Sequence, residues 1–216
     1  MSNRIRHYSV VDKTISQCHV FLEICFGKPI AKRKNPAKES DKQLPLTPVE
    51  KKQSVSFMRV NHSGEVCAQA LYRGQMILSE KPAVRAILET AAEQETDHLA
   101  WCQERVYELG GHVSYLNIFW YTSAFLIGLL TGLSGDSLSL SFVEETEKQV
   151  EVHLAGHLHK LPLTDIKSRK ILEQMQKDEI EHGHKAKSAG TKKLPYPVKK
   201  LMALHAKVMT TLAYWI

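Results

Sequence analysis

One unit of sequence occurs twice in this chain of 216 residues: a glutamate, followed 30 or 32 residues later by the motif Glu-x-x-His. In chain order, the residues of the two units are Glu65, Glu95, His98, Glu147, Glu179 and His182. A lone Glu-x-x-His carries little weight, because the 17 glutamates and 11 histidines of this chain give about one match by chance. Glu181-x-x-His184 also fits the motif, but a shift of two residues rotates it by about 200° on the helix, toward Gln174 and Lys177. The other two matches, each with a partner glutamate at nearly the same distance, are more specific. The repeat therefore predicts two similar structural units.

Helix signals divide the chain into segments that carry these units. Residues 47–50 (TPVE) supply an N-cap, a proline at the first helical position and a glutamate at the third. Glycines at 110–111 and 190 are stop signals, and we expect Asp136 to cap the helix that carries Glu147. No segment alternates with the period of two that strands show, so the chain is predicted to be all-α. The expected helices span residues 47–79, 83–109, 136–160, 165–188 and 198–216.

The repeated residues are expected at matching heights. In each unit, the lone glutamate lies about as far before the connecting turn as the Glu-x-x-His glutamate lies after it, at a rise of ~1.5 Å per residue. All six residues also lie on apolar stripes of their helices. Glu144, one turn before Glu147, is the nearest rival for a place on such a stripe. The carboxylates expected on a solvated helix face are Glu89, Glu93, Asp97 and Glu104.

Four glutamates and two histidines among apolar side chains need partners, because an isolated buried carboxylate is very unfavourable. A buried network of ion pairs is one solution, but those stripes carry no lysine or arginine. Four carboxylates balance two divalent cations, and oxygen-rich ligands without thiolates favour iron or manganese. A lone glutamate from each of two helices and Glu-x-x-His from the other two is also the ligand pattern of di-iron four-helix bundles. The sequence therefore predicts a two-metal site.

The net charge of +6 conceals an uneven distribution along the chain. Residues 1–52 carry a net charge of +6, residues 53–182 carry −7, and residues 183–216 carry +7. The basic ends match no nucleic-acid motif, so we expect no nucleic-acid partner. Anionic lipid headgroups are the better match, with solvated tails as the alternative. The four cysteines form no CxxC pair, which favours a reducing compartment over a disulfide scaffold.

One stretch, residues 113–135, contains no charged residue. It is long enough to cross a membrane, but its glycines and polar residues favour a buried or interfacial crossover between the second and third helices of the bundle. Residues 198–216 carry an apolar stripe with lysines beside it. The predicted domains are a basic extension and linker over residues 1–46, the bundle over 47–190, and a C-terminal amphipathic helix over 191–216. We expect residues 28–46 to be a linker without periodic structure, and the chain to have no cleavable signal peptide.

Several segments resemble one family, the ferritin-like, carboxylate-bridged di-iron demethoxyubiquinone hydroxylases of ubiquinone biosynthesis. The most specific is residues 58–65 (MRVNHSGE), followed by Tyr72 and Gly74-Gln75. The resemblance covers about residues 57–190, and its remaining segments are 95–98 (ETDH), Glu147 with His153, and 178–182 (DEIEH). Family members often follow the histidine at 153 with Tyr-Asn, whereas here Leu154 and Ala155 follow it.

The resemblance implies a ferritin-like four-helix bundle and two iron ions per subunit. The implied ligands are the six residues of the repeat, with Glu95 and Glu179 as bridges, and His153 has a possible role in electron transfer. The implied reaction uses O2 to hydroxylate the ring of a demethoxyubiquinol, a quinol with a polyprenyl tail. We therefore expect peripheral association with the cytoplasmic face of a bacterial-type cell membrane, and possible partners among ubiquinone-pathway proteins. A ferritin-like iron store or peroxide scavenger and a non-catalytic lipid-binding helical protein are the alternatives.

Overall fold

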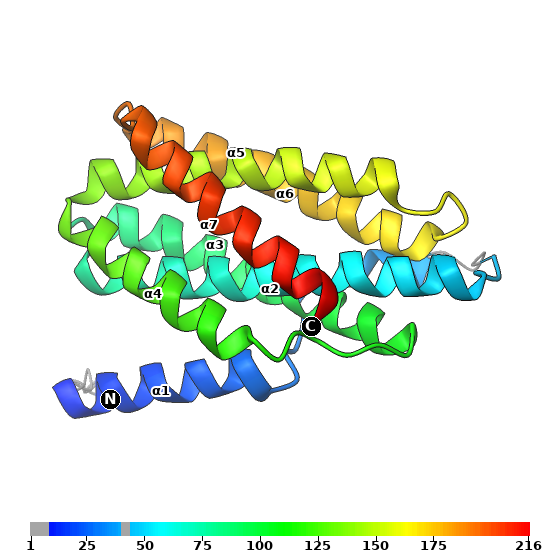
Figure 1. The fold of residues 1–216 in the computed structure, drawn as a ribbon. Coiled ribbons are helices and arrows are strands. Elements are labelled where there is room, and N and C mark those ends of the chain that lie inside the picture. The colour runs from blue at the N-terminus through cyan, green and yellow to red at the C-terminus, as the bar shows by residue number, and fades with distance from the viewer. Residues whose placement is uncertain (1–8, 40–43) are drawn as a thin grey trace.

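The computed structural model describes residues 9–39 and 44–216, and all regular structure in these two ranges is helical (Figure 1). The prediction of an all-α chain is thus confirmed. In chain order, the elements are α1 (Val10–Phe26), the 3-10 turn η1 (Pro36–Glu39), α2 (Pro48–Leu78), α3 (Pro82–Glu108), α4 (Asn117–Leu133), α5 (Asp136–Lys160), α6 (Ile166–Ser188) and α7 (Tyr196–Trp215).

Helices α2, α3, α5 and α6 form the predicted four-helix bundle (Figure 1). Short turns join α2 to α3 and α5 to α6, so each of these pairs is antiparallel. The bundle core is apolar at both ends. One cluster lies around Trp101 and Leu172, and the other around Leu88 and Leu140. The metal-ligand candidates lie between these two clusters along the bundle.

The helix caps agree with the sequence at α2 but differ at α5. Thr47 and Glu50 form the expected capping box of α2. The prediction that Asp136 caps α5 is wrong, because Gly135 is the N-cap residue and no side chain caps this helix end. The Asp136 carboxylate instead accepts hydrogen bonds from Ser79 Oγ (3.0 Å) and the backbone N–H of Lys81 (2.9 Å). It therefore stabilises the turn between α2 and α3, where three donors converge on one acidic side chain.

Helix α4 is the predicted crossover from α3 to α5, and it packs along α2 (Figure 1). The two backbones come very close at Gly74 and Gly128, where a Cβ atom added to Gly128 would lie 2.3 Å from the Leu71 carbonyl oxygen. The glycines that dilute this apolar stretch thus permit close packing of two helices. Among the described residues, none of the helices combines the length and the apolarity that crossing a membrane requires.

Helix α7 runs obliquely across α2 and α5, as Figure 1 shows. It begins at Tyr196, two residues earlier than predicted, and it buries Met209 and Ala213 against Trp120 of α4. The predicted additional C-terminal helix is therefore present and packs on the bundle.

The N-terminal part of the chain is more structured than its sequence indicates. Helix α1 was not predicted, and it packs against α4 through contacts such as the edge-to-face pair of Phe21 and Tyr121. The segment after it is also not an irregular linker throughout, because η1 forms there and Asn35 and Ala37 are buried. Local periodicity could not show this, since the segment is held by tertiary contacts with α3 and α6.

Candidate metal centre

The structure brings all six residues of the sequence repeat together in the middle of the bundle. Each of the six residues is at most 3 % exposed. They form two overlapping groups in which the potential ligand atoms lie within 4.8 Å of one another. The first group is Glu65, Glu95, His98 and Glu179, and the second is Glu95, Glu147, Glu179 and His182. Glu95 and Glu179 are common to both groups, which is the arrangement that two bridging carboxylates require.

In the first group, the Nδ1 atom of His98 faces the three carboxylates. It lies 2.9 Å from Glu95 Oε2, 3.4 Å from Glu179 Oε1 and 3.6 Å from Glu65 Oε2. The opposite ring nitrogen, Nε2, lies 2.8 Å from Asp178 Oδ2. A proton on Nε2 would leave the Nδ1 lone pair free for a cation among the carboxylates.

The second group repeats this geometry with His182. Its Nδ1 atom lies 3.2 Å from Glu95 Oε1, 3.4 Å from Glu179 Oε2 and 3.8 Å from Glu147 Oε1. Its Nε2 atom lies 2.8 Å from the side-chain oxygen of Gln94. Each histidine is therefore oriented by an acceptor on the side away from the carboxylates, as histidine ligands of metals usually are.

Two buried atoms in the second group lack a hydrogen-bond partner, namely Glu95 Oε1 and His182 Nδ1. They lie 3.2 Å apart but are not aligned for a hydrogen bond. Unsatisfied buried polar atoms are uncommon, and here an acceptor oxygen and a ring nitrogen point toward the same place. A cation between them would satisfy both, so the donor set fits a divalent metal.

The electrostatics of the cluster lead to the same conclusion. Burial, together with the charge of Glu95, raises the pKa of Glu65 well above its usual range, and burial and Glu179 do the same to the pKa of Glu147. Burial opposes the charged form of His98, but Glu95 and hydrogen bonding outweigh it and raise the pKa of His98. Four carboxylates at this depth cannot all be charged without cations. Protonated His98 and His182 outweigh burial and lower the pKa values of Glu95 and Glu179, but those of Glu65 and Glu147 remain raised. Two metal ions would allow all four carboxylates to be charged.

Glu144, the alternative candidate to Glu147 on α5, lies outside both ligand groups. Glu144 is half-buried, and its carboxylate lies 3.9 Å from Lys187 Nζ near the surface. Glu93 is exposed, as expected, and pairs with Lys32. Asp97, however, was wrongly assigned to the solvated face of α3. It is 3 % exposed, because the N-terminal segment covers it and Arg33 pairs with it.

The sequence did not identify roles for four residues that support the cluster. Asp178 and Gln94 accept from the two histidines, the Tyr72 hydroxyl donates to Glu147, and Arg33 pairs with Asp178. Tyr72 and Asp178 lie in the segments that resemble the hydroxylase family, which is the one sequence signal for them. Arg33 comes from a segment without periodicity, so no local pattern could place it at the site.

His153 is in neither ligand group. It lies on α5 with its ring centroid 3.9 Å from that of His157, whose Nδ1 is 2.9 Å from Asn61 Oδ1. Burial is the main reason that the pKa of His153 is lowered to about 4 and that of His157 to about 2. Both rings are therefore neutral at pH 7.

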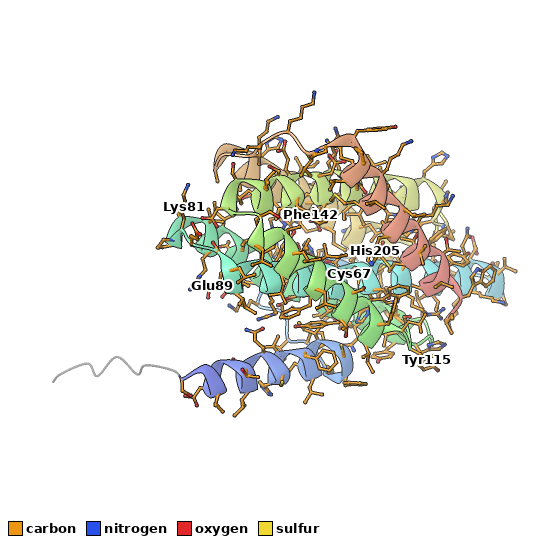
Figure 2. The ribbon with its side chains drawn as sticks, turned by 60° about the vertical axis from the view of Figure 1, so that its left-hand side comes forward. Cys67, Lys81, Glu89, Tyr115, Phe142 and His205 are labelled. Atoms are coloured by element: carbon orange, nitrogen blue, oxygen red, sulfur yellow. The ribbon has the colours of Figure 1, made fainter. Side chains whose placement is uncertain are left out.

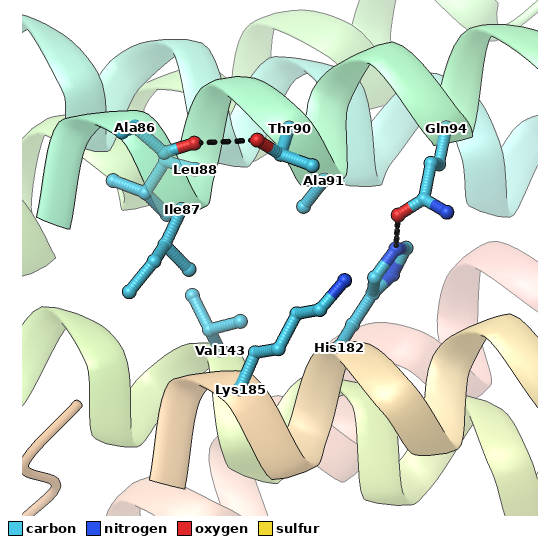
Figure 3. Close-up of a pocket in the computed structure, with 9 residues that line it drawn as sticks. All are labelled: Ala86, Ile87, Leu88, Thr90, Ala91, Gln94, Val143, His182 and Lys185. Atoms are coloured by element: carbon cyan, nitrogen blue, oxygen red, sulfur yellow. Dashed lines mark hydrogen bonds between the residues drawn. The ribbon is translucent and has the colours of Figure 1, made fainter. Parts of the chain in front are cut away.

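A cavity of about 270 Å³ adjoins the second ligand group between α3, α5 and α6 (Figure 3). His182 and Gln94 form its polar wall, whereas most of its other lining is aliphatic. The lining residues are Ala86, Ile87, Leu88, Thr90, Ala91, Gln94, Val143, His182 and Lys185. The first ligand group has no residue in this lining.

Comparison with known protein families gives a match that covers the candidate metal centre. The family described as "Ubiquinone biosynthesis protein COQ7" matches residues 52–213, about three quarters of the chain. The chain belongs to the COQ7 family. The matched region includes all six members of the two ligand groups, so the COQ7 family match and the geometry concern the same part of the chain.

Three relatives that share one name align with nearly the whole chain. A 3-demethoxyubiquinol 3-hydroxylase of Coxiella burnetii (strain Dugway 5J108-111) is 70 % identical over all 216 residues, covering 100 % of both chains. Proteins of that name from Polynucleobacter asymbioticus and Bordetella pertussis are 49 % and 46 % identical. Those two alignments cover 96 % and 98 % of this chain, and 100 % and 95 % of the relatives. The resemblance found in the sequence is thus confirmed.

Proposed function

We propose that this chain is a 3-demethoxyubiquinol hydroxylase that uses O2 and two iron ions bound by the six repeated residues. The observation that carries the proposal is the pair of overlapping carboxylate–histidine groups, in a chain 70 % identical over its full length to a protein named for this activity. The reaction replaces a ring C–H bond by C–OH. The second oxygen atom of O2 leaves as water, with two electrons from a reductant and two protons.

The side chains of this site have separate tasks. Glu65 and His98 would hold one iron ion, Glu147 and His182 would hold the other, and Glu95 and Glu179 would lie between them. Iron bound there supplies redox chemistry toward O2 that side chains lack. The remaining task of the protein is to orient the ligands and to keep water away from them.

Hydrogen bonds from outside the ligand groups perform the orienting. Asp178 and Gln94 accept from the Nε2 atoms of the two histidines, and each thereby fixes the direction of one imidazole ring. The Tyr72 hydroxyl donates to Glu147 and holds one orientation of that carboxylate. Apolar packing at both ends of the cluster excludes water from it. For His153 we propose a role in electron transfer, on the grounds of its family resemblance.

The aliphatic cavity beside His182 suits O2 and the apolar faces of the substrate's aromatic ring, whose hydroxyl groups would need the polar wall that Gln94 and His182 form. We propose that O2 and the ring reach the ligands there. Replacing Ala86, an exposed residue of the cavity lining, by tryptophan should obstruct the space without disturbing the buried core. We expect the initial rate of hydroxylation to fall about tenfold, the order of effect that steric misfit has in an apolar pocket, while the bound iron is unchanged.

The matched control is Ala83→Trp. Ala83 is also exposed and lies about one helical turn before Ala86 on α3, but it does not line the cavity. It should retain the rate of the unmodified protein. Equal rates for the two variants would contradict the proposed use of the cavity.

We further propose that the protein acts on the cytoplasmic face of the cell membrane as a peripheral protein. Helices α1, α4 and α7 lie outside the bundle (Figure 2). They carry large apolar side chains that are exposed. Examples are Phe26, Phe119, Leu130, Leu201, Leu204 and Trp215. Lysines on α7 and in the loop before it add positive charge that would attract anionic headgroups. A substrate with a polyprenyl tail requires such a surface, because the tail stays in the bilayer.

The double substitution Leu130→Glu and Leu201→Glu should weaken membrane binding. Both leucines are more than 60 % exposed, so the bundle should fold normally. Loss of two apolar contacts, each worth about 1.5–3 kcal/mol when fully buried, should reduce the fraction that sediments with anionic phospholipid vesicles by at least about tenfold. Val152→Glu changes an equally exposed residue of α5 and should sediment normally. Undiminished sedimentation of the double variant would contradict this docking surface.

The activity itself is best tested by quinone profiling. Cells that lack the protein should accumulate a demethoxy quinone precursor, and the unmodified gene should restore the mature quinone. Purified iron-loaded protein with reductant and O2 should convert the precursor in detergent or vesicles. A protein that binds iron without performing this conversion would instead be an iron store or a peroxide scavenger.

A further inference from the structure

The segment between α1 and η1 lies over α3 and α6, and one of its residues reaches the edge of the metal-ligand cluster. Arg33 Nε lies 2.6 Å from Asp97 Oδ2 on α3, and Arg33 Nη1 lies 2.9 Å from Asp178 Oδ2 on α6. Its guanidinium group also lies over the Trp101 ring, 4.9 Å from the centroid. The backbone N–H of Lys32 adds a 2.6 Å hydrogen bond to Asp97 Oδ1. The segment is therefore attached at a defined position.

This attachment continues to a ligand atom. The same oxygen of Asp178 that pairs with Arg33 accepts from His98 Nε2 at 2.8 Å. Arg33 Nη2 lies 3.4 Å from that ring nitrogen. Arg33, Asp178 and His98 thus form a continuous chain of contacts from the N-terminal segment to the first ligand group.

The second ligand group has a different support. His182 Nε2 is held by the neutral side chain of Gln94, at 2.8 Å. Gln94 is half-buried and, like His182, lines the cavity. One histidine is therefore oriented by a carboxylate that an arginine holds in place, whereas the other is oriented by an amide beside an open space.

We propose that Arg33 is a positioning residue for His98, and that it makes the Glu65–His98 position the slower of the two to release its metal. The inference rests on the proposed two-metal function. A carboxylate acceptor raises the basicity of a histidine ligand and fixes its ring. Without Arg33, two carboxylates that are only 3 % and 5 % exposed, Asp97 and Asp178, would lose their shared counter-charge. Asp178 would then no longer hold His98 firmly.

The test is the rate at which the full-length protein, loaded with Co²⁺, releases the metal to an excess of chelator. We expect two kinetic phases from the unmodified protein. Arg33→Gln should accelerate the slow phase by about tenfold, the lower end of the 10–100-fold loss of metal affinity that follows removal of a direct hydrogen-bond partner of a ligand, because Asp178 itself remains. The fast phase should change less than about twofold. Gln94→Ala should do the reverse and accelerate the fast phase alone, which assigns the phases to the two positions.

Lys32→Gln is the matched control, because Lys32 makes a surface ion pair with Glu93 and its side chain does not contact Asp97 or Asp178. Both phases should be unchanged in this variant. Arg33→Lys keeps the charge but not the forked donor, so its slow phase should be intermediate. It also provides the test if Arg33→Gln does not give folded protein by circular dichroism.

Three results would overturn the inference: a single phase in the unmodified protein, a slow phase that Arg33 variants leave unchanged, or equal acceleration of both phases by Arg33→Gln. The last result would indicate a general structural role. Failure of the unmodified protein to bind metal at all would instead overturn the proposed function.

Discussion

Substitution of Glu147 by alanine should reduce the bound iron from two ions per chain to one or fewer and abolish hydroxylation. Glu147 is 2 % exposed, and among the four glutamates of the cluster it is the one found in the second ligand group alone. Its loss removes an anionic ligand of the metal at His182, together with the carboxylate that Tyr72 orients. Iron would be measured by a colorimetric chelator assay on protein purified and reconstituted without oxygen.

Glu144→Ala is the control for this prediction, because it removes a carboxylate one helical turn away on the same helix. Glu144 is half-buried and lies near Lys187 rather than in the cluster. We expect this variant to bind two iron ions and to retain its activity. Two iron ions in Glu147→Ala, or a loss in Glu144→Ala, would show that the ligand assignment on α5 is incorrect.

Replacing Gly128 by valine should produce the largest loss of stability. A Cβ atom there would lie 2.3 Å from the Leu71 carbonyl oxygen and 3.1 Å from the Gly74 Cα. Both contacts are with backbone atoms, so no side-chain rotation can relieve them and α4 must move away from α2. Overpacking commonly costs about 1–3 kcal/mol and occasionally more. We expect a loss of at least about 3 kcal/mol in the free energy of unfolding, measured by urea denaturation of the metal-free protein.

Gly156→Ala is the matched comparison. Gly156 lies inside α5, and an added Cβ would meet no atom within 4 Å. Because alanine favours the helix over glycine, this change should raise the free energy of unfolding by about 0.5–1 kcal/mol. A Gly128 variant as stable as this control would mean that the close α2–α4 contact does not contribute to stability.

The grouping of the six candidate ligands was accessible from the sequence because these residues obey helical periodicity. Glu95 and His98 lie one turn apart on an apolar stripe, and the same holds for Glu179 and His182. Apolar stripes point inward in a bundle, so grouping of these side chains follows from spacing and turn positions. The end of α5 at Lys160 was also predicted correctly, since Pro162 lies just beyond it.

The features that the sequence did not reveal depend on partners distant in the chain. Asp136 occupies the first turn of a helix, where an acidic residue commonly caps, yet its partners are in the turn at residues 79–81. Asp97 lies beside exposed carboxylates on α3, but a segment more than sixty residues earlier covers it. No periodic pattern in one helix encodes which remote segment will pack against it.

Each ligand group takes members from both halves of the sequence repeat. The first contains Glu179 from the second half, and the second contains Glu95 from the first half. A metal ion bound in either group would therefore close a loop of more than eighty residues, as a disulfide does. Unlike a disulfide, this cross-link would depend on the supply of metal and not on the redox state of thiols. Neither half of the repeat could then be an independent folding unit, although each is a complete unit of sequence.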